Sequence, residues 1–327
     1  MQRKLRSRLS RLGLLAGSTV LLTGCSAHDV ELKLRFGWPT GVTKQAERMR
    51  TLWTWSSVAA LVVGVIVWGL IFWACGRYRR RNDVLPEQFK YHLPIEIAYS
   101  IAPFLIIAVL FYYTAITENY VDKLSPNPDA VVQVDAFKWN WQFEYQKTDG
   151  VATTYNAQNG SGVADPGVGT PLSTVGSSTE IPVLVLPVNK KVQIVEVSED
   201  VVHSFWVPEF LFKRDVIPYG TDANGDPKHP NRFEFTATKM GSYVGRCAEL
   251  CGTYHSQMNF EVRVVSDADY TKYLDALSKI GSQDPNRQSE ALVAIGGSPC
   301  ATTTHPFNTN RSAKAASEAT TCDTKSS

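Results

Sequence analysis

Long apolar stretches dominate the first third of the chain, and two of them are long enough to cross a membrane. Residues 52–74 carry no formal charge. A helix of about 23 residues rises about 35 Å, which exceeds a hydrocarbon core of about 30 Å. A second apolar stretch, residues 95–116, is interrupted by Glu96 and Pro103. The pattern predicts two membrane-spanning helices joined by a short loop.

The loop between the two predicted spans is rich in arginine and sets their orientation. Residues 77–81 read Arg-Tyr-Arg-Arg-Arg. Cytoplasmic loops carry an excess of Lys and Arg, so we expect this loop to stay in the cytoplasm. Both termini, and everything after the second span, are then expected outside the cell membrane.

An earlier apolar run has the character of an export signal. Basic residues precede the run from Leu12 to Leu22, and Thr23 and Gly24 lead directly into Cys25. This arrangement predicts a lipoprotein signal peptide over residues 1–24, with Cys25 as the lipidated first residue of the mature chain. An uncleaved signal anchor is the alternative. Both readings agree with an exported N-terminus.

After residue 120 the pattern changes to short runs of β-branched and aromatic residues separated by Gly, Pro and Asn. Such runs are typical of antiparallel strands in a sandwich or barrel. We expect an all-β domain over residues 121–280. The clearest strand candidates are 131–143, 181–186, 191–197, 232–236 and 259–265.

The remaining parts of this region predict loops, one helix and a tail. Residues 148–180 and 219–231 are polar and predict long surface loops. Ser266 precedes Asp269 by three residues, which predicts a capped short helix. Its apolar stripe comprises Tyr270, Tyr273, Leu274 and Leu277. Residues 281–327 are rich in Ala, Ser and Thr and predict a flexible tail.

The charge balance narrows the range of partners. The formal net charge is +2 over 327 residues, which gives no basic excess that would indicate nucleic-acid binding. The partners therefore have to be inferred from the membrane spans and from local motifs.

One segment concentrates metal-binding side chains. Cys247, Cys251, His255 and Met258 lie within twelve residues, and His203 lies upstream. Thiolate, thioether and imidazole are ligands that select copper. Two cysteines in one loop exceed the single cysteine of a mononuclear blue-copper site, and two bridging thiolates can hold two ions.

Two other interpretations of the cysteines stay open at this point. Paired cysteines in an exported domain commonly form a disulfide. Two Cys and two His can also hold zinc. Neither interpretation explains Met258 or the position of Glu249 between the thiols.

Residues 52–280 resemble subunit II of the haem-copper cytochrome c oxidases. The spacing Cys-x-Glu-x-Cys-x3-His-x2-Met, with an upstream His-Ser-aromatic, is similar to the dinuclear copper A loop of that family. The resemblance implies a two-helix transmembrane hairpin followed by a cupredoxin-like Greek-key sandwich.

The same resemblance implies a role for each residue of the motif. Cys247 and Cys251 would bridge two copper ions, with His203 and His255 binding one ion each. Met258 would be a weak ligand. Glu249 would supply its backbone carbonyl to copper and its side chain to a magnesium ion at the interface with subunit I.

The resemblance also implies an electron entry and a proton entry. Trp139 would take electrons from cytochrome c, and Glu96, seven residues before Pro103, would stand at the mouth of a proton channel. Trp141, Phe143 and Tyr145 fit better as the core face of a strand. Exposed acids would steer a basic haem protein to the patch. The candidate acids are Glu144, Asp149, Glu199 and Asp200.

The function implied is that of a cytochrome c oxidase subunit II, which accepts electrons from cytochrome c and passes them to haem in subunit I. Oxygen reduction and coupled proton translocation take place in subunit I. The implied partners are subunits I and III, a soluble or membrane-bound cytochrome c, a cytochrome bc complex and the membrane. Nucleic acid is not among them.

Three rival classes can be compared with this reading. A quinol oxidase subunit II has the same shape but lacks the copper ligands. Nitrous oxide reductase has the same loop but also a large catalytic domain. A copper-delivery protein would exchange its metal readily.

The remaining cysteines and histidines predict little chemistry. Cys75 is expected to be an inert thiol at the membrane edge. Cys300 and Cys322 lie outside the membrane and can form a disulfide. His28, His229 and His305 lack neighbouring ligands in the sequence.

Overall fold

The computed structural model describes residues 38–80, 85, 87–148, 172–176, 181–218, 231–284 and 286–296. The elements below belong to a compact unit that begins at Gly41. Several predictions lie outside the described residues. These are the signal peptide 1–24, the lipidation at Cys25, most of the loops 148–180 and 219–231, Asp149, His28, His229, His305, Cys300 and Cys322.

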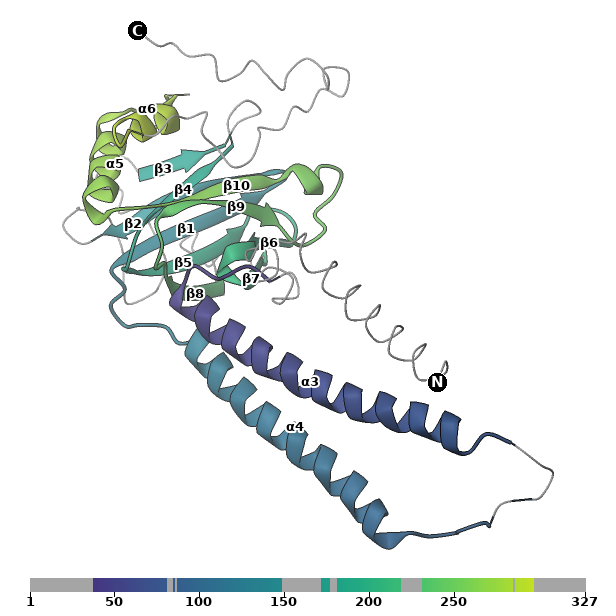
Figure 1. Cartoon of the computed structure of the whole chain (residues 1–327). Helices are drawn as coiled ribbons and strands as arrows, with labels where there is room; N and C mark the ends of the chain where they lie inside the picture. The colour runs from purple at the N-terminus through teal and green to yellow at the C-terminus, as the bar shows by residue number, and fades with distance from the viewer. Residues whose placement is uncertain are drawn as a thin grey trace, which may run out of the picture. The chain divides into compact units, whose positions relative to one another are not determined.

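Two long apolar helices form a hairpin (Figure 1). Helix α3 spans Lys44–Arg77 and α4 spans Leu93–Val121, with hydropathies of 2.5 and 2.1 over their most apolar windows. Both windows are free of buried residues, as expected of helices that a membrane covers. Both helices extend beyond the predicted spans, because polar residues continue the helix past the apolar stretch. Thr43 caps the start of α3 by accepting the Ala46 N–H at 2.9 Å.

The start of α3 and the end of α4 are both joined to the β domain. Thr43 forms a β-bridge with Ala237, and the Glu234 carboxylate accepts hydrogen bonds from the Ser125 N–H and hydroxyl at 2.9 and 2.8 Å. Arg214 and Asp122 form an ion pair at 2.6 Å. Hydrogen bonds and an ion pair therefore attach the start of α3 and the end of α4 to the β domain.

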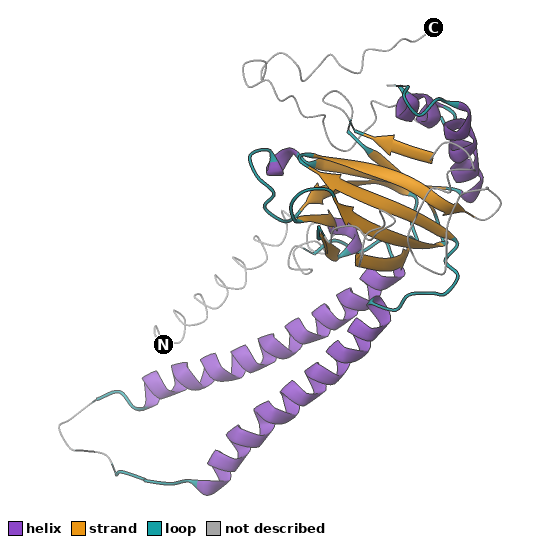
Figure 2. Ribbon diagram, turned by 180° about the vertical axis from the view of Figure 1, so that it is seen from behind, coloured by secondary structure: helices purple, strands orange, loops and turns teal. Residues whose placement is uncertain are grey.

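The β domain is a sandwich of two five-stranded sheets (Figure 2). Their strand orders are β3-β2-β1-β5-β8 and β4-β10-β9-β6-β7. The pairs β1/β5 and β4/β10 are parallel, and the other pairs are antiparallel. The strands are β1 Ala130–Phe137, β2 Asn140–Thr148, β3 Leu172–Val175, β4 Val183–Pro187, β5 Lys191–Ser198, β6 His203–Val207, β7 Phe212–Val216, β8 Asn231–Thr236, β9 Gly241–Cys247 and β10 Asn259–Val265.

Aromatic rings from both sheets fill the space between them. Trp141 and Phe143 of β2 pack edge-to-face against Phe260 of β10, with ring centroids 5.1 and 5.7 Å apart. Phe205 of β6 lies 4.7 Å from Phe260. Trp141, Phe143 and Tyr145 are buried, as their alternation along the strand predicted. This packing fixes β2, β6 and β10 relative to one another.

The predicted strand 131–143 is in fact a hairpin. The chain turns at Lys138 and Trp139, and Phe137 pairs with Asn140. The run contains no Gly or Pro to mark a turn, so the hydrophobic pattern passes through it without interruption. Three short strands, β6, β7 and β9, were also missed, and β3 lies within a stretch that we predicted to be a loop.

The helix predicted to follow the sandwich is present. A further helix, Arg287–Val293, was not predicted. Helix α5 spans Asp267–Lys279 and begins at Ser266, whose hydroxyl accepts the Asp269 N–H at 3.1 Å. The predicted stripe of Tyr and Leu residues on α5 is buried. Two short 3₁₀ helices, η1 Pro208–Phe210 and η2 His255–Gln257, complete the domain.

The prediction of a flexible tail from residue 281 is wrong over residues 286–296. Helix α6 spans Arg287–Val293, and its Ala291 and Leu292 are buried in the core. The Gln288 side-chain oxygen accepts a hydrogen bond from the Val183 N–H at 2.8 Å, and its NH₂ group donates to the Ile181 carbonyl at 2.8 Å. The helix is short and mostly polar, so two apolar side chains were too weak a signal to predict it.

Candidate metal centre

Two neighbouring strands bring the upstream histidine to the cysteine loop. His203 begins β6 and Cys247 ends β9, and these strands pair with Phe205 opposite Cys247. The loop then runs to Met258, whose carbonyl accepts the Cys247 N–H at 3.0 Å. This bond closes the loop at its base. A separation of 44 positions along the chain thereby becomes a contact.

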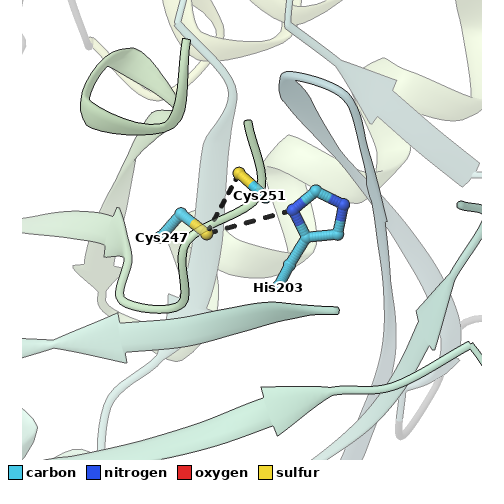
Figure 3. Close-up of side chains that lie close together, drawn as sticks. All are labelled: His203, Cys247 and Cys251. Atoms are coloured by element: carbon cyan, nitrogen blue, oxygen red, sulfur yellow. Dashed lines mark hydrogen bonds between the residues drawn. The ribbon is translucent and has the colours of Figure 1, made fainter. Parts of the chain in front are cut away.

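Six potential ligand atoms face one another around this loop. The Sγ atoms of Cys247 and Cys251 lie 3.8 Å apart, and both thiols are free. Figure 3 shows the Cys247 sulfur between the Cys251 sulfur and the ring of His203, with a dashed line to each. Cys247 Sγ also lies 3.9 Å from His203 Nδ1 and 3.2 Å from the Glu249 carbonyl oxygen. Cys251 Sγ lies 3.6 Å from His255 Nδ1 and 3.8 Å from Met258 Sδ.

The arrangement places an imidazole beside each thiol. His203, Cys247 and Cys251 place their ligand atoms within 4.8 Å of one another, and His255 is not part of that group. His203 Nδ1 lies 3.9 Å from Cys247 Sγ, and His255 Nδ1 lies 3.6 Å from Cys251 Sγ. A single zinc ion needs four ligands around one point. Soft sulfur and nitrogen donors of this kind suit copper.

The two thiols cannot easily both be ionised without a cation. Burial, together with the neighbouring Cys247 sulfur, raises the pKa of Cys251 to about 12. Metal ligation requires thiolates, and a bound cation offsets the repulsion between them. The buried sulfur pair is therefore suited to bind a cation.

Asp200 fixes the orientation of His203. Its carboxylate lies 2.8 Å from His203 Nε2, which leaves Nδ1 directed at the sulfur. The Lys138 and Val201 N–H groups also donate to it, at 2.8 and 2.7 Å. Burial lowers the pKa of His203, which favours the neutral ring that binds metal. A carboxylate behind a ligating histidine is a recurrent feature of metal sites.

Trp139 lies against the cysteine loop. Its indole N–H donates to the Cys251 carbonyl at 3.1 Å, and its ring packs edge-on to Tyr254 at 4.9 Å. Gly252 lies directly under the indole, since a Cβ there would come within 3.2 Å of it. The half-buried ring thus lies between the protein surface and the backbone of Cys251. Sequence reasoning did not identify Tyr254 or Gly252, or the role of Asp200.

The other predicted site residues lie apart from the sulfur pair. The Glu249 side chain is 45% exposed and lies 3.8 Å from Lys213. Glu96 is in the first turn of α4, where its carboxylate accepts the His92 N–H at 2.9 Å. This hydrogen bond caps the helix, which is a structural role that the sequence did not indicate.

Of the predicted steering acids, Glu199 is exposed and Glu144 is half-buried. Burial raises the pKa of Glu144. Asp200 is held by His203 and two backbone N–H groups, so it contributes more to the site than to the surface.

Comparisons with known proteins identify the family. A family profile described as cytochrome c oxidase subunit II, periplasmic domain, matches residues 130–265. A protein of Nocardia farcinica described as "Probable cytochrome c oxidase subunit 2" is 45% identical, covering 94% of this chain and 90% of its own length. The chain belongs to the cytochrome c oxidase subunit II family. The cytochrome c oxidase subunit 2 of Mycobacterium tuberculosis is 41% identical over 93% of this chain and 90% of its own, and that of Corynebacterium glutamicum is 38% identical over 86% of each.

Solved structures that match are more distant in sequence. The periplasmic domain of subunit II of cytochrome oxidase of Bradyrhizobium japonicum is 24% identical, with a TM-score of 0.35, and the match covers 48% of this chain and 98% of that domain. The family membership predicted from the cysteine motif is confirmed by the close relatives. The chain is accordingly a subunit of a cytochrome c oxidase, and its β domain is the one that is periplasmic in the family.

Proposed function

We propose that this chain binds two copper ions between Cys247 and Cys251, and that it carries electrons from cytochrome c to haem in subunit I. The observation that supports this most strongly is the pairing of each thiol with its own imidazole, at 3.9 and 3.6 Å. Copper bound there would supply a one-electron carrier whose charge is shared by two ions.

The surrounding residues hold the ligands in place and keep water out. Cys247, Cys251 and Met258 are 7%, 4% and 1% exposed. The Trp141 indole N–H donates to the Met258 carbonyl at 3.3 Å, which ties the last ligand to β2. A rigid, dry ligand set changes little when charge arrives or leaves, and this favours rapid transfer.

Electron entry is assigned to Trp139. Its half-buried ring donates to the Cys251 carbonyl, which gives a direct contact to the backbone of one of the proposed ligands. Glu199 and the partly exposed Glu144 would attract a basic cytochrome c, whether soluble or membrane-bound. A cytochrome bc complex that carries such a cytochrome is an equally suitable donor.

Three further parts of the proposal concern the rest of the oxidase. The half-exposed Glu249 carboxylate is available for a magnesium ion at the interface with subunit I. Glu96 would admit protons at the cytoplasmic end of α4. Subunits I and III would cover the apolar surfaces of α3 and α4, in a cell membrane with both termini outside. Oxygen reduction and proton translocation would then belong to subunit I.

Copper counting and electron paramagnetic resonance on the full-length chain in detergent test the proposal. We expect two copper ions per chain and a spectrum in which one unpaired electron is shared by both. Cys247→Ser should abolish this spectrum while the circular dichroism of the sandwich stays unchanged. Cys75→Ser, which changes an exposed thiol on α3, is the matched control and should keep the spectrum. One zinc ion per chain, or a native disulfide between Cys247 and Cys251, would refute the proposal.

A copper-delivery protein is the second candidate, since the same ligands would serve it. It would release copper to a chelator within the time of mixing and would show no shared electron. A copper-free quinol oxidase subunit is disfavoured by the intact ligand set.

A further inference from the structure

A carboxyl group without a partner is buried near the end of β5. Glu196 is 0% exposed, and neither of its oxygens has a hydrogen-bond partner among the described residues. Ile194 and Val192, two and four positions earlier, belong to the hydrophobic core. Side chains at this spacing share one face of a strand. Glu196 therefore points into the space between the two sheets.

The residues paired with Glu196 on the two flanking strands carry no positive charge, and Arg232 of β8 pairs with Val195, which places it on the other face of the sheet. The cross-strand neighbours of Glu196 are Val134 on β1 and Asn231 on β8. The Asn231 amide donates to the Asp215 carbonyl at 2.8 Å. Compensation for a charge on Glu196 would have to come from the opposite sheet.

Of the arginines on the opposite sheet, Arg214 is the one whose charge acts on Glu196, and a second acid already binds it. Arg214 of β7 donates from Nη2 to the Asp122 carboxylate at 2.6 Å, just beyond the end of α4. Its Nε is buried and has no hydrogen-bond partner among the described residues. Asp215, the next residue, adds a negative charge to the same region. Arg214 thus acts on two carboxyl groups, those of Asp122 and Glu196. It forms a hydrogen bond only with Asp122, the more exposed of the two.

The protonation state of Glu196 follows from its burial and from the presence of more carboxyl groups than positive charges around it. An ionised carboxylate that is buried without hydrogen bonds is far more costly than a neutral acid. Burial raises the pKa of Glu196 well above its usual value, the charge of Arg214 opposes this rise, and Asp215 adds to it. A buried titratable group of this kind, outside any metal site, is a candidate for proton binding.

We propose that Glu196, Arg214 and Asp122 form a proton-binding site on the domain side of α4, in which Glu196 holds the proton while Arg214 pairs with Asp122. On release, the O–H bond of the acid breaks, the proton passes to water, and the carboxylate takes Arg214 as its counter-ion. No electron moves in this step. None of the three residues belongs to the proposed copper ligands, so the site goes beyond the electron-transfer role and stands independently of it.

Infrared spectroscopy of the full-length chain in detergent tests whether Glu196 is protonated. We expect the C=O band of a protonated carboxyl group that persists above neutral pH and shifts in D₂O. Glu196→Gln, a neutral variant of nearly the same shape, should remove this band. Glu199→Gln removes an exposed acid three residues away and should leave the band intact. Absence of the band in the wild-type chain overturns the proposal. So does its persistence in Glu196→Gln at a pH well above about 7, the value to which burial raises the pKa of Asp135.

Two further variants test the link through Arg214. Asp122→Asn frees Arg214 to stabilise the Glu196 carboxylate, so the band should disappear at a pH lower by about one unit, the size expected for one nearby charge. Arg214→Gln removes the counter-ion and should move the midpoint upward. Midpoints that stay unchanged in Asp122→Asn, in a variant whose circular dichroism matches that of the wild type, overturn the assignment of Asp122 and Arg214 to the site.

Discussion

Replacing Asp200 by Asn is expected to weaken metal binding without moving any ligand residue. The carboxylate accepts hydrogen bonds from the Lys138 and Val201 N–H groups at 2.8 and 2.7 Å and lies 2.8 Å from His203 Nε2. An amide of the same shape has only one oxygen. Whichever way it turns, its NH₂ group faces a donor that the carboxylate oxygen had satisfied.

The size of the effect follows from these three contacts. One hydrogen bond to a charged acceptor is lost, worth about 1.5–3 kcal/mol when buried. Asp200 is 25% exposed, so water replaces part of the loss. We therefore expect the free energy of unfolding to fall by about 1–2 kcal/mol. His203 also loses the charge behind its ring, and such changes lower metal affinity by about 10–100-fold.

The assay is a copper titration of the full-length chain against a competing chelator, combined with thermal unfolding. Glu199→Gln is the matched control, because it removes the adjacent acid, which is exposed. The control should retain wild-type affinity. If Asp200→Asn binds copper as tightly as Glu199→Gln, then Asp200 does not orient His203 in the way described.

Three further predictions concern the indole, the loop and a buried acid. Trp139→Phe removes the hydrogen bond to the Cys251 carbonyl. It should slow electron entry from cytochrome c by more than about tenfold while the copper content stays at the wild-type level, as stopped-flow reduction would measure; an unchanged rate would exclude Trp139 as the entry point. Gly252→Ala places a Cβ 3.2 Å from that indole at a backbone φ of +117°, so it should destabilise the domain by about 1–2 kcal/mol in denaturant unfolding. A gain in stability would contradict this. Burial raises the pKa of Asp135 from 3.8 to about 7, so the folded state binds more protons than the unfolded state between these values and stability should fall as the pH rises from about 4 to about 7. Asp135→Asn should lack this fall, and an equal slope in both proteins would show that another group causes it.

Elements with a strong hydrophobic period were predicted well. The spans around residues 52–74 and 95–116 lie within α3 and α4, and the stripe on α5 is buried as expected. Elements whose formation depends on tertiary contacts were not predicted from the sequence. The turn at Lys138 and Trp139 has no Gly or Pro, and α6 is held in part by a glutamine that bonds the backbone of a distant segment.

The candidate site shows the same division. A short motif identified Cys247, Cys251, His255 and Met258, because their spacing is local. His203 was included as a second imidazole far upstream, and only the pairing of β6 with β9 explains why it is near. Asp200 was taken for a surface acid, because the sequence does not reveal that its carboxylate turns inward to a ring three residues away.

The hydrogen bond from Cys247 N–H to the Met258 carbonyl has a consequence for how the metal is acquired. Folding of the sandwich also orders the loop. The conformational entropy of arranging the ligands is therefore lost on folding, before any ion binds. Binding affinity then comes from the metal–ligand bonds alone. In contrast to small zinc domains that unfold when stripped, this domain is expected to survive chelation intact, which makes the folded, metal-free protein the form that a copper donor would meet.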